Sequence, residues 1–249
     1  MSFTLSLDAE SENDDEDVLD LVASLLLRVR KLVKMVKNGS NILRWARKKQ
    51  KQYNIKYELL KDFRGRWNYT FLCLKRVLEY YSIVKELTSL RDRKDIPGLS
   101  KPQLLELHKL QLDDHDWALA LALSETLEPF YLATKCLSIR TTQTFGDGFI
   151  YLKFIKNFLA SPYDLNNLPA STDESIDNSP NSTAQMELKR IRESSPLFYT
   201  LVNHLKENLL EAFEEYTSRH LSKKQQDAML VSVTSYWIIK FQIYLNIIF

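Results

Sequence analysis

The sequence Asp62-Phe63-Arg64-Gly65-Arg66-Trp67-Asn68-Tyr69-Thr70 gathers cationic, aromatic and amide side chains between two segments with helical hydrophobic periodicity. Arg64 and Arg66 carry cations that can hold phosphate groups. Trp67 offers a stacking surface, and Asn68 offers an amide that can read a base edge. Two interpretations remain open at this point: a nucleic-acid contact, or a core tryptophan flanked by solvated arginines.

A long amphipathic helix is predicted upstream of this stretch. Its apolar residues recur with 4-3-4-3-4 spacing, which is typical of one buried helix face: Val18, Val22, Leu25, Val29, Leu32 and Val36. We expect the helix to begin near residues 14–17, where carboxylates suit the positive end of the helix dipole, and to end with Gly39 in a left-handed conformation. The seam is shorter than the roughly three to four heptads of a coiled coil, so we expect it to pack within the fold.

A short basic helix is predicted from residue 41 to about residue 52, with Ser40 as its N-cap. Its apolar residues Ile42, Leu43 and Trp45 lie on or near one face. The cations lie mostly elsewhere: Arg44, Arg47, Lys48, Lys49 and Lys51. Two interpretations are again open. The cations form a solvated face, or they follow DNA phosphates with salt-sensitive binding and no sequence preference.

Further helices are predicted over residues 69–89, 102–112, 114–138, 149–159 and 184–220, the last with a bend near 194–196. The helix over 114–138 carries too many large apolar residues for one face, so we expect it at the centre of a bundle, with a kink before Pro129. Gly146 and Gly148 are expected to break the chain before the helix that follows. The domain plan is therefore a disordered acidic tail at 1–14, a helical region at 15–160, a disordered loop at 161–183, a second helical region at 184–227 and an apolar tail at 228–249.

The apolar tail at 228–249 is close to the length of a membrane span, so a tail anchor is one interpretation. Lys240, Gln242 and Asn246 interrupt it, and a charge near the centre of a bilayer is costly. We therefore do not expect a membrane to be a partner. An accidental apolar tail on a truncated reading frame is the interpretation that we favour.

The charges of the 249-residue chain are segregated, although its net charge is only +2. Residues 1–27 carry acidic groups and no basic one, whereas residues 21–57 carry lysines and arginines and no acid. A basic stretch of this kind favours polyanions as partners. The charge alone does not distinguish a binding surface from a solvated one.

No metal or cofactor motif is recognisable. Cys73 and Cys136 lie inside apolar helical patterns, which favours buried thiols in a reducing compartment, and the four histidines lack ligand spacing. The acids of residues 14–17 suit a helix N-terminus better than a metal site. Since phosphate loops and hydrolase motifs are also missing, we expect no cofactor.

Two ordered blocks carry a family resemblance. Asp62-x-x-Gly65-Arg66-Trp67-Asn68-x-Thr70 resembles the Arg-Trp block of hAT-type (hobo/Activator-like) DNA transposases and their host-captured zinc-finger BED-domain relatives. That block usually reads Thr-Arg-Trp-Asn-Ser-Thr, so Gly65 and Tyr69 depart from it. A second block resembles the family in order and spacing: Trp117, Leu127-Glu128-Pro129-Phe130, Thr134-x-x-Leu137-Ser138 and Gln143-Thr144.

The resemblance implies a mainly α fold: a helical bundle corresponding to the family's insertion domain, with at most a small strand remnant of a ribonuclease H-like α/β core. Family members cleave DNA with three carboxylates that hold two metal ions. Two of those acids precede the Arg-Trp block on core strands, and the third follows the helical insertion. The residues before Asp62 read instead as helix and acidic tail, and the chain ends before the third acid's segment. We therefore expect a fragment without enzymatic activity of its own, in which Asp62 is not a metal ligand.

The resemblance also implies roles for individual residues. Trp67 corresponds to a tryptophan that stacks on a flipped base, and Arg66 to a phosphate contact; Asn68 and Thr70 match the motif, with helix capping as an alternative role. The predicted nucleic-acid-binding set is Arg64, Arg66, Trp67, Asn68, Arg44, Arg47 and Lys48. The implied partners are DNA and a full-length transposase-like protein, in the nucleus. The alternative is a helical protein-interaction module, or a tail-anchored membrane protein, without a nucleic-acid role.

Overall fold

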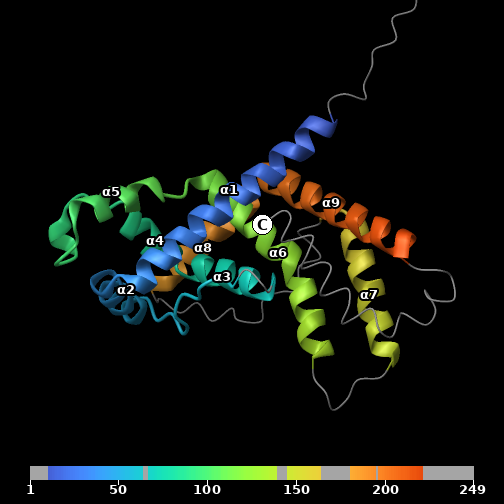
Figure 1. Cartoon of the computed structure of the whole chain (residues 1–249), viewed down its shortest axis with the longest axis horizontal. Coiled ribbons are helices and arrows are strands. Elements are labelled where there is room, and N and C mark those ends of the chain that lie inside the picture. The colour runs from blue at the N-terminus through green and yellow to red at the C-terminus, as the bar shows by residue number, and fades with distance from the viewer. Residues whose placement is uncertain (1–10, 64–66, 139–144, 164–179, 195, 221–249) are drawn as a thin grey trace, which may run out of the picture.

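The computed structural model describes residues 11–63, 67–138, 145–163, 180–194 and 196–220 (Figure 1). Over these residues the regular elements are helices, and no β-strand is present, which confirms the predicted mainly α fold. The α-helices are α1 (Ser11–Asn38), α2 (Ser40–Gln52), α3 (Trp67–Glu79), α4 (Tyr81–Thr88), α5 (Lys101–Lys109), α6 (Asp114–Leu137), α7 (Phe145–Ala160), α8 (Pro180–Ser194) and α9 (Pro196–His220), with a 3-10 turn at Arg93–Asp95.

The long helix α1 buries the apolar seam that its spacing predicted. All six seam residues, from Val18 to Val36, are buried, together with Leu26 and Val33. Helix α1 contacts α2, α6 and α9, so the seam packs inside the fold as expected. The helix begins at Ser11, before the predicted start near residues 14–17.

The corner between α1 and α2 differs from the prediction. Gly39 has φ −85° and ψ 104°, so it is extended and not left-handed. It is Gly39 that occupies the N-cap position, while Ser40 is already helical and supplies no capping side chain. The reason is that one residue serves both helices: its N–H donates to the Met35 carbonyl of α1, and its carbonyl accepts from the Leu43 N–H of α2.

The prediction of a single helix over 69–89 is wrong, because the structure divides this span into α3 and α4 at Tyr80. The Tyr80 N–H donates to the carbonyls of both Arg76 and Val77, which tightens the turn there. Tyr80 and Tyr81 are both buried. Neighbouring side chains on a straight helix point about 100° apart, and the turn lets both rings enter the core.

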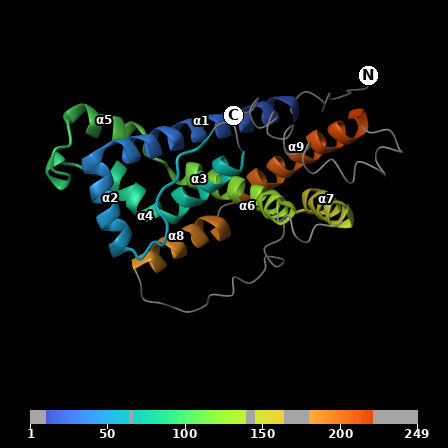
Figure 2. The same ribbon diagram turned by 60° about the horizontal axis from the view of Figure 1, so that its bottom comes forward.

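Helix α6 is the centre of the bundle, as its composition predicted. It contacts α1, α3, α7, α8 and α9 (Figure 2). Alternating alanine and leucine residues from Ala118 to Leu123 are all buried, so neighbouring helices approach it from several sides. Near its N-terminus the buried Trp117 makes an edge contact with Tyr81, their ring centroids lying 4.7 Å apart. The helix continues through Pro129 to Leu137.

A second, smaller apolar cluster joins the C-terminal half of α6 to α7 and α9. It is formed by Phe130, Ala133, Ile155, Leu159 and Phe213. Helix α7 begins at Phe145 and includes Gly146 and Gly148, so the expected break at these glycines is wrong. Both glycines lie in the first turn of α7, and glycine costs only about 1 kcal/mol even in a helix interior. Figure 1 shows α7 and the end of α9 on the opposite side of the molecule from α2 and α5.

Over the helix predicted at 184–220 the structure describes α8 and α9, and residue 195, which falls in the predicted bend at 194–196, lies outside the described residues. Helix α8 already begins at Pro180, within the span expected to be a loop. In the parts of the chain that the structure describes, no helix is both long and apolar enough to cross a bilayer. The apolar tail at 228–249 lies outside the described residues.

Candidate nucleic-acid interface

The two ends of the Arg-Trp block are fixed to α1 by one carboxylate. Asp62 accepts hydrogen bonds from Arg30 Nε at 2.6 Å and from Thr70 Oγ1 at 2.9 Å. The Asp62 side chain is only 2 % exposed, so this contact is a buried ion pair reinforced by a hydroxyl. The motif acid and threonine therefore have a structural role, since their hydrogen bond ties the first turn of α3 to Asp62 and, through Arg30, to α1.

Within the Arg-Trp block the structure describes only some of the predicted binding residues. Arg64 and Arg66 lie outside the described residues, and Trp67 is the first residue of α3. Asn68 is partly buried, and its Oδ1 is buried with no hydrogen-bond partner among the described residues. Capping is therefore not the role of this oxygen, and Thr70 donates to Asp62 instead.

The cations of α2 fall into two groups, those paired with a carboxylate and those without a described carboxylate partner. One of the pairing carboxylates comes from the loop that follows α2. Glu58 accepts hydrogen bonds from Arg47 Nε at 2.8 Å and from Lys37 Nζ at 2.9 Å. Both contacts lower the pKa of Glu58, and the hydrogen bond from Arg47 has the larger effect. Another α2 cation, Lys49, pairs with Glu86 of α4. Arg47 is thus partly neutralised, although it remains exposed.

Arg44 and Lys48 are exposed and have no carboxylate partner among the described residues. They share one helix face with Lys51, at positions i, i+4 and i+7, and the buried Ile42 and Ala46 occupy the other side. The three cations span about 10 Å along the helix axis. Helix α2 therefore presents an uncompensated basic face, defined here as Arg44, Lys48 and Lys51.

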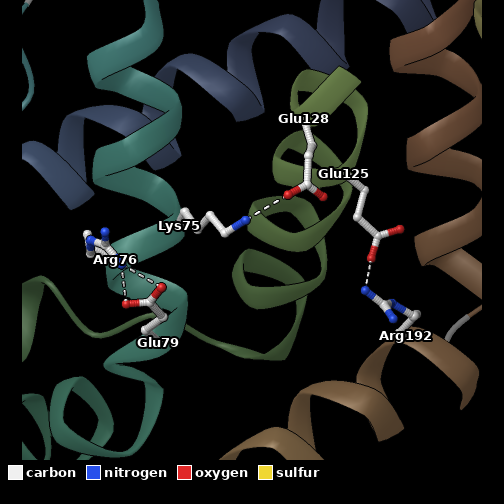
Figure 3. Close-up of polar contacts among 6 residues, drawn as sticks. All are labelled: Lys75, Arg76, Glu79, Glu125, Glu128 and Arg192. Carbon is white, nitrogen blue, oxygen red and sulfur yellow. Dashed lines mark hydrogen bonds and ion pairs between the residues drawn. The ribbon is translucent and has the colours of Figure 1, made fainter. Parts of the chain in front are cut away.

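The cations that follow the Arg-Trp block on α3 are paired, in contrast to those of α2. Lys75 Nζ lies 2.7 Å from Glu128 Oε1 of α6, and Arg76 Nη1 lies 2.7 Å from Glu79 Oε2 within α3. Figure 3 shows both contacts. The Arg76 guanidinium also lies 4.0 Å from the centre of the Tyr57 ring. These side chains connect helices or cover an aromatic ring, and in this they differ from the exposed Arg44 and Lys48 of α2.

The second block with family resemblance is structural where it is described. Trp117, Leu127 and Phe130 are buried, and Thr134 Oγ1 donates to the Phe130 carbonyl within α6. In the same helix, Glu125 forms an ion pair with Arg192 of α8 (Figure 3). Gln143 and Thr144 lie outside the described residues. This block therefore maintains the bundle around α6.

One group in the described ranges brings possible metal ligands together: Asp113, His115 and Asp116, with one ligand atom of each within 4.8 Å of the others. Both acids are already engaged. Asp113 and Asp116 form the capping box of α6, and the Asp116 carboxylate is held by the Arg28 guanidinium. A cation would have to displace Arg28, so we interpret the group as a helix N-terminus fixed to α1.

One exposed residue was missing from the predicted set. Phe63 is 63 % exposed, and its ring centre lies 6.1 Å from that of Tyr69. The sequence gives only a weak signal that Phe63 is exposed, because this apolar residue directly follows Asp62 within a polar segment. Its exposure is visible only in the structure, where the Asp62 side chain is buried and the neighbouring Phe63 ring is not.

Comparison with known proteins places the basic helix and the Arg-Trp block in one matched segment. The family model of the ZBED1 RNase-like helical domain matches residues 13–109, which contain α1 to α5. The second block, which begins at Trp117, lies outside the match. No curated protein and no solved structure matches the chain. Residues 13–109 are thus similar to the ZBED1 RNase-like helical domain, and the match supports a relationship to zinc-finger BED and hAT transposase-derived proteins.

Proposed function

We propose that this chain is a hAT transposase-like protein that binds DNA weakly and without sequence preference, and that it does not cleave DNA by itself. The binding surface consists of the uncompensated basic face of α2, the neighbouring Arg47, and the segment of Arg64, Arg66, Trp67 and Asn68. The nucleus is the matching compartment, and a full-length transposase-like protein is a further partner under this proposal.

The observation that carries the proposal is that two exposed cations of α2, Arg44 and Lys48, have no carboxylate partner among the described residues. Acids of the fold neutralise Arg28, Arg30, Lys75 and Arg76, whereas Arg44 and Lys48 stay exposed and unpaired with any described carboxylate. Exposed cations on one helix face attract phosphates and displace the counterions of DNA. Such contacts read no base edges, which supports binding without sequence preference.

The Arg-Trp segment supports the proposal by its position in the chain. It lies within the matched residues 13–109, and Asp62 ties its N-terminal end to α1. Arginines bind phosphate oxygens in a bidentate manner, and tryptophan stacks on bases. The segment therefore adds groups of the kind that bind nucleic acid to those already present on α2.

The absence of cleavage is proposed because the buried acids serve as structural ion-pair partners. Two-metal cleavage needs several carboxylates directed at a common point. Asp62 and Asp116, which are the most buried acids in the ion pairs described above, are held by Arg30 and Arg28. We expect an end-labelled DNA duplex to remain intact when it is incubated with the chain and Mg²⁺. Time-dependent cleavage that survives further purification would contradict this.

DNA binding is tested by fluorescence anisotropy with a labelled duplex at low salt. The variant Arg44→Ala/Lys48→Ala removes two unpaired cations and is expected to weaken binding at least about five-fold. The matched control is Lys101→Ala/Lys109→Ala, which removes two exposed cations from α5 and changes the net charge equally. We expect this control to bind within about two-fold of the wild type. Equal losses in both variants would show that net charge, and not the α2 face, governs binding.

A further inference from the structure

Phe63 is presented to solvent by a backbone that is held in place on its N-terminal side. Leu59 is buried, and the Asp62 side chain is held by Arg30 and Thr70. Phe63 follows directly and is 63 % exposed. Its ring leans against Tyr69 of α3, with centroids 6.1 Å apart and planes tilted by 56°. An aromatic ring supported from one side and open on the other is suited to stacking.

The segment that precedes Phe63 carries exposed lysines whose charge is not cancelled by the acids of the same segment. Glu58 is neutralised by Lys37 and Arg47, as described above, and Asp62 is buried against Arg30. Lys56 and Lys61 are left exposed. Lys61 Nζ donates to Asn38 Oδ1, and the Lys56 ammonium lies 5.2 Å from the centre of the Tyr57 ring. Neither has a carboxylate partner among the described residues, so the segment that bears Phe63 attracts anions.

We propose that Phe63, supported by Tyr69, stacks on unpaired bases, so that the chain binds single-stranded DNA in preference to duplex. This inference rests on the proposed DNA binding and specifies the form of DNA. In a duplex the base faces are covered by their neighbours, whereas an unpaired base offers a free face. Stacking accepts any base, and Lys56 and Lys61 lie on the same segment to contact the strand's phosphates.

The test compares a labelled single strand with the matching duplex at one salt concentration. Phe63→Ala is expected to weaken single-strand binding about ten-fold and duplex binding less than about two-fold. Phe63→Trp keeps a stacking face and is expected to retain single-strand affinity. Phe63→Leu keeps an apolar side chain of similar reach and is expected to lose affinity as the alanine variant does. Because the ring is exposed, circular dichroism should show all three variants folded.

Several results would overturn the inference. If Phe63→Leu binds single strands as the wild type does, the ring contributes apolar contact and not stacking. If neither Phe63→Ala nor Phe63→Leu changes binding to either DNA while Arg44→Ala/Lys48→Ala weakens both, DNA binding stands and Phe63 serves another partner, such as a protein. If the wild type binds neither DNA, the proposed function itself fails.

Discussion

At the scale of single residues, the contact that matters most for the candidate interface is the one between Arg30 and Asp62. Both side chains are largely buried, and Thr70 completes the hydrogen bonding of the carboxylate. Removing one partner of a buried pair leaves the other charge without compensation, which costs more than the pair contributes. The ion pair thus fixes Asp62 to α1 and, through Thr70, the first turn of α3 as well.

Arg30→Met is therefore expected to lower the free energy of unfolding by about 3 kcal/mol, since Asp62 stays buried and loses its cation. Urea denaturation followed by circular dichroism measures the loss. The double variant Arg30→Met/Asp62→Asn replaces the carboxylate by a neutral amide and should recover part of the stability. A single variant as stable as the wild type would show that Asp62 reaches solvent.

Cys73 gives a prediction for alkaline pH. Burial raises the pKa of this thiol to about 12 from the ordinary value of 9.0, and the charge of Asp62 contributes in the same direction. In the unfolded chain the thiol ionises from about pH 9 upward, while the folded chain keeps it protonated. Stability should therefore fall by about 1.4 kcal/mol per pH unit between these two values.

The measurement is the free energy of unfolding between about pH 8 and pH 11 for the wild type and Cys73→Ala. The slopes are compared, because the substitution also leaves a small cavity. We expect a shallower slope in the variant. The slope will not vanish, because burial also raises the pKa values of Tyr80 and Tyr163. Identical slopes would mean that the thiol ionises equally in both states.

At the scale of elements, the turn before α5 is fitted closely to the start of α2. Gly98 has φ +81°, a conformation that other residues adopt with strain, and a Cβ there would lie 2.4 Å from Asn41 Nδ2. Gly98→Ala is expected to cost about 2 kcal/mol, from backbone strain and the clash together. In the double variant Gly98→Ala/Asn41→Ala the clash is removed, whereas the backbone strain at residue 98 remains.

Thermal unfolding of both variants separates the two contributions. The double variant should recover part of the lost stability and remain less stable than Asn41→Ala alone, since the left-handed backbone costs about 1 kcal/mol for alanine. An unchanged melting temperature for Gly98→Ala would show that the turn relaxes without cost.

The elements also show how far periodicity predicts this fold. The seam of α1 and the central position of α6 follow from apolar spacing, because burial is what the spacing reports. The ends of helices were less predictable, since single hydrogen bonds decide them. The double contact of Gly39 at the corner of α1 and α2, and the bifurcated N–H of Tyr80, leave no signature in the pattern of apolar residues.

At the scale of the whole molecule, the proposed interface depends on where the acids lie in the folded chain. Arg44, Arg47 and Lys48 look equivalent in the sequence, yet only Arg47 has Glu58 beside it in the structure. The buried Asp62 and the exposed Phe63 are neighbours in sequence with opposite environments. The sequence could therefore predict the basic helix and the motif, but not which side chains remain free to bind.

DNA binding through unpaired cations has a measurable salt dependence. The logarithm of the binding constant for a duplex falls linearly with the logarithm of salt concentration, with a slope of about −0.9 for each phosphate neutralised. Among the predicted cations that the structure describes, Arg44 and Lys48 are exposed and have no described carboxylate partner. Their contribution can therefore be counted directly from the slope.

The most direct test is this slope for the wild type, Arg44→Ala/Lys48→Ala and the control Lys101→Ala/Lys109→Ala. We predict that the slope of the α2 variant is shallower by about two and that the control slope equals that of the wild type. Equal slopes for the wild type and the α2 variant would contradict DNA binding by the uncompensated face of α2.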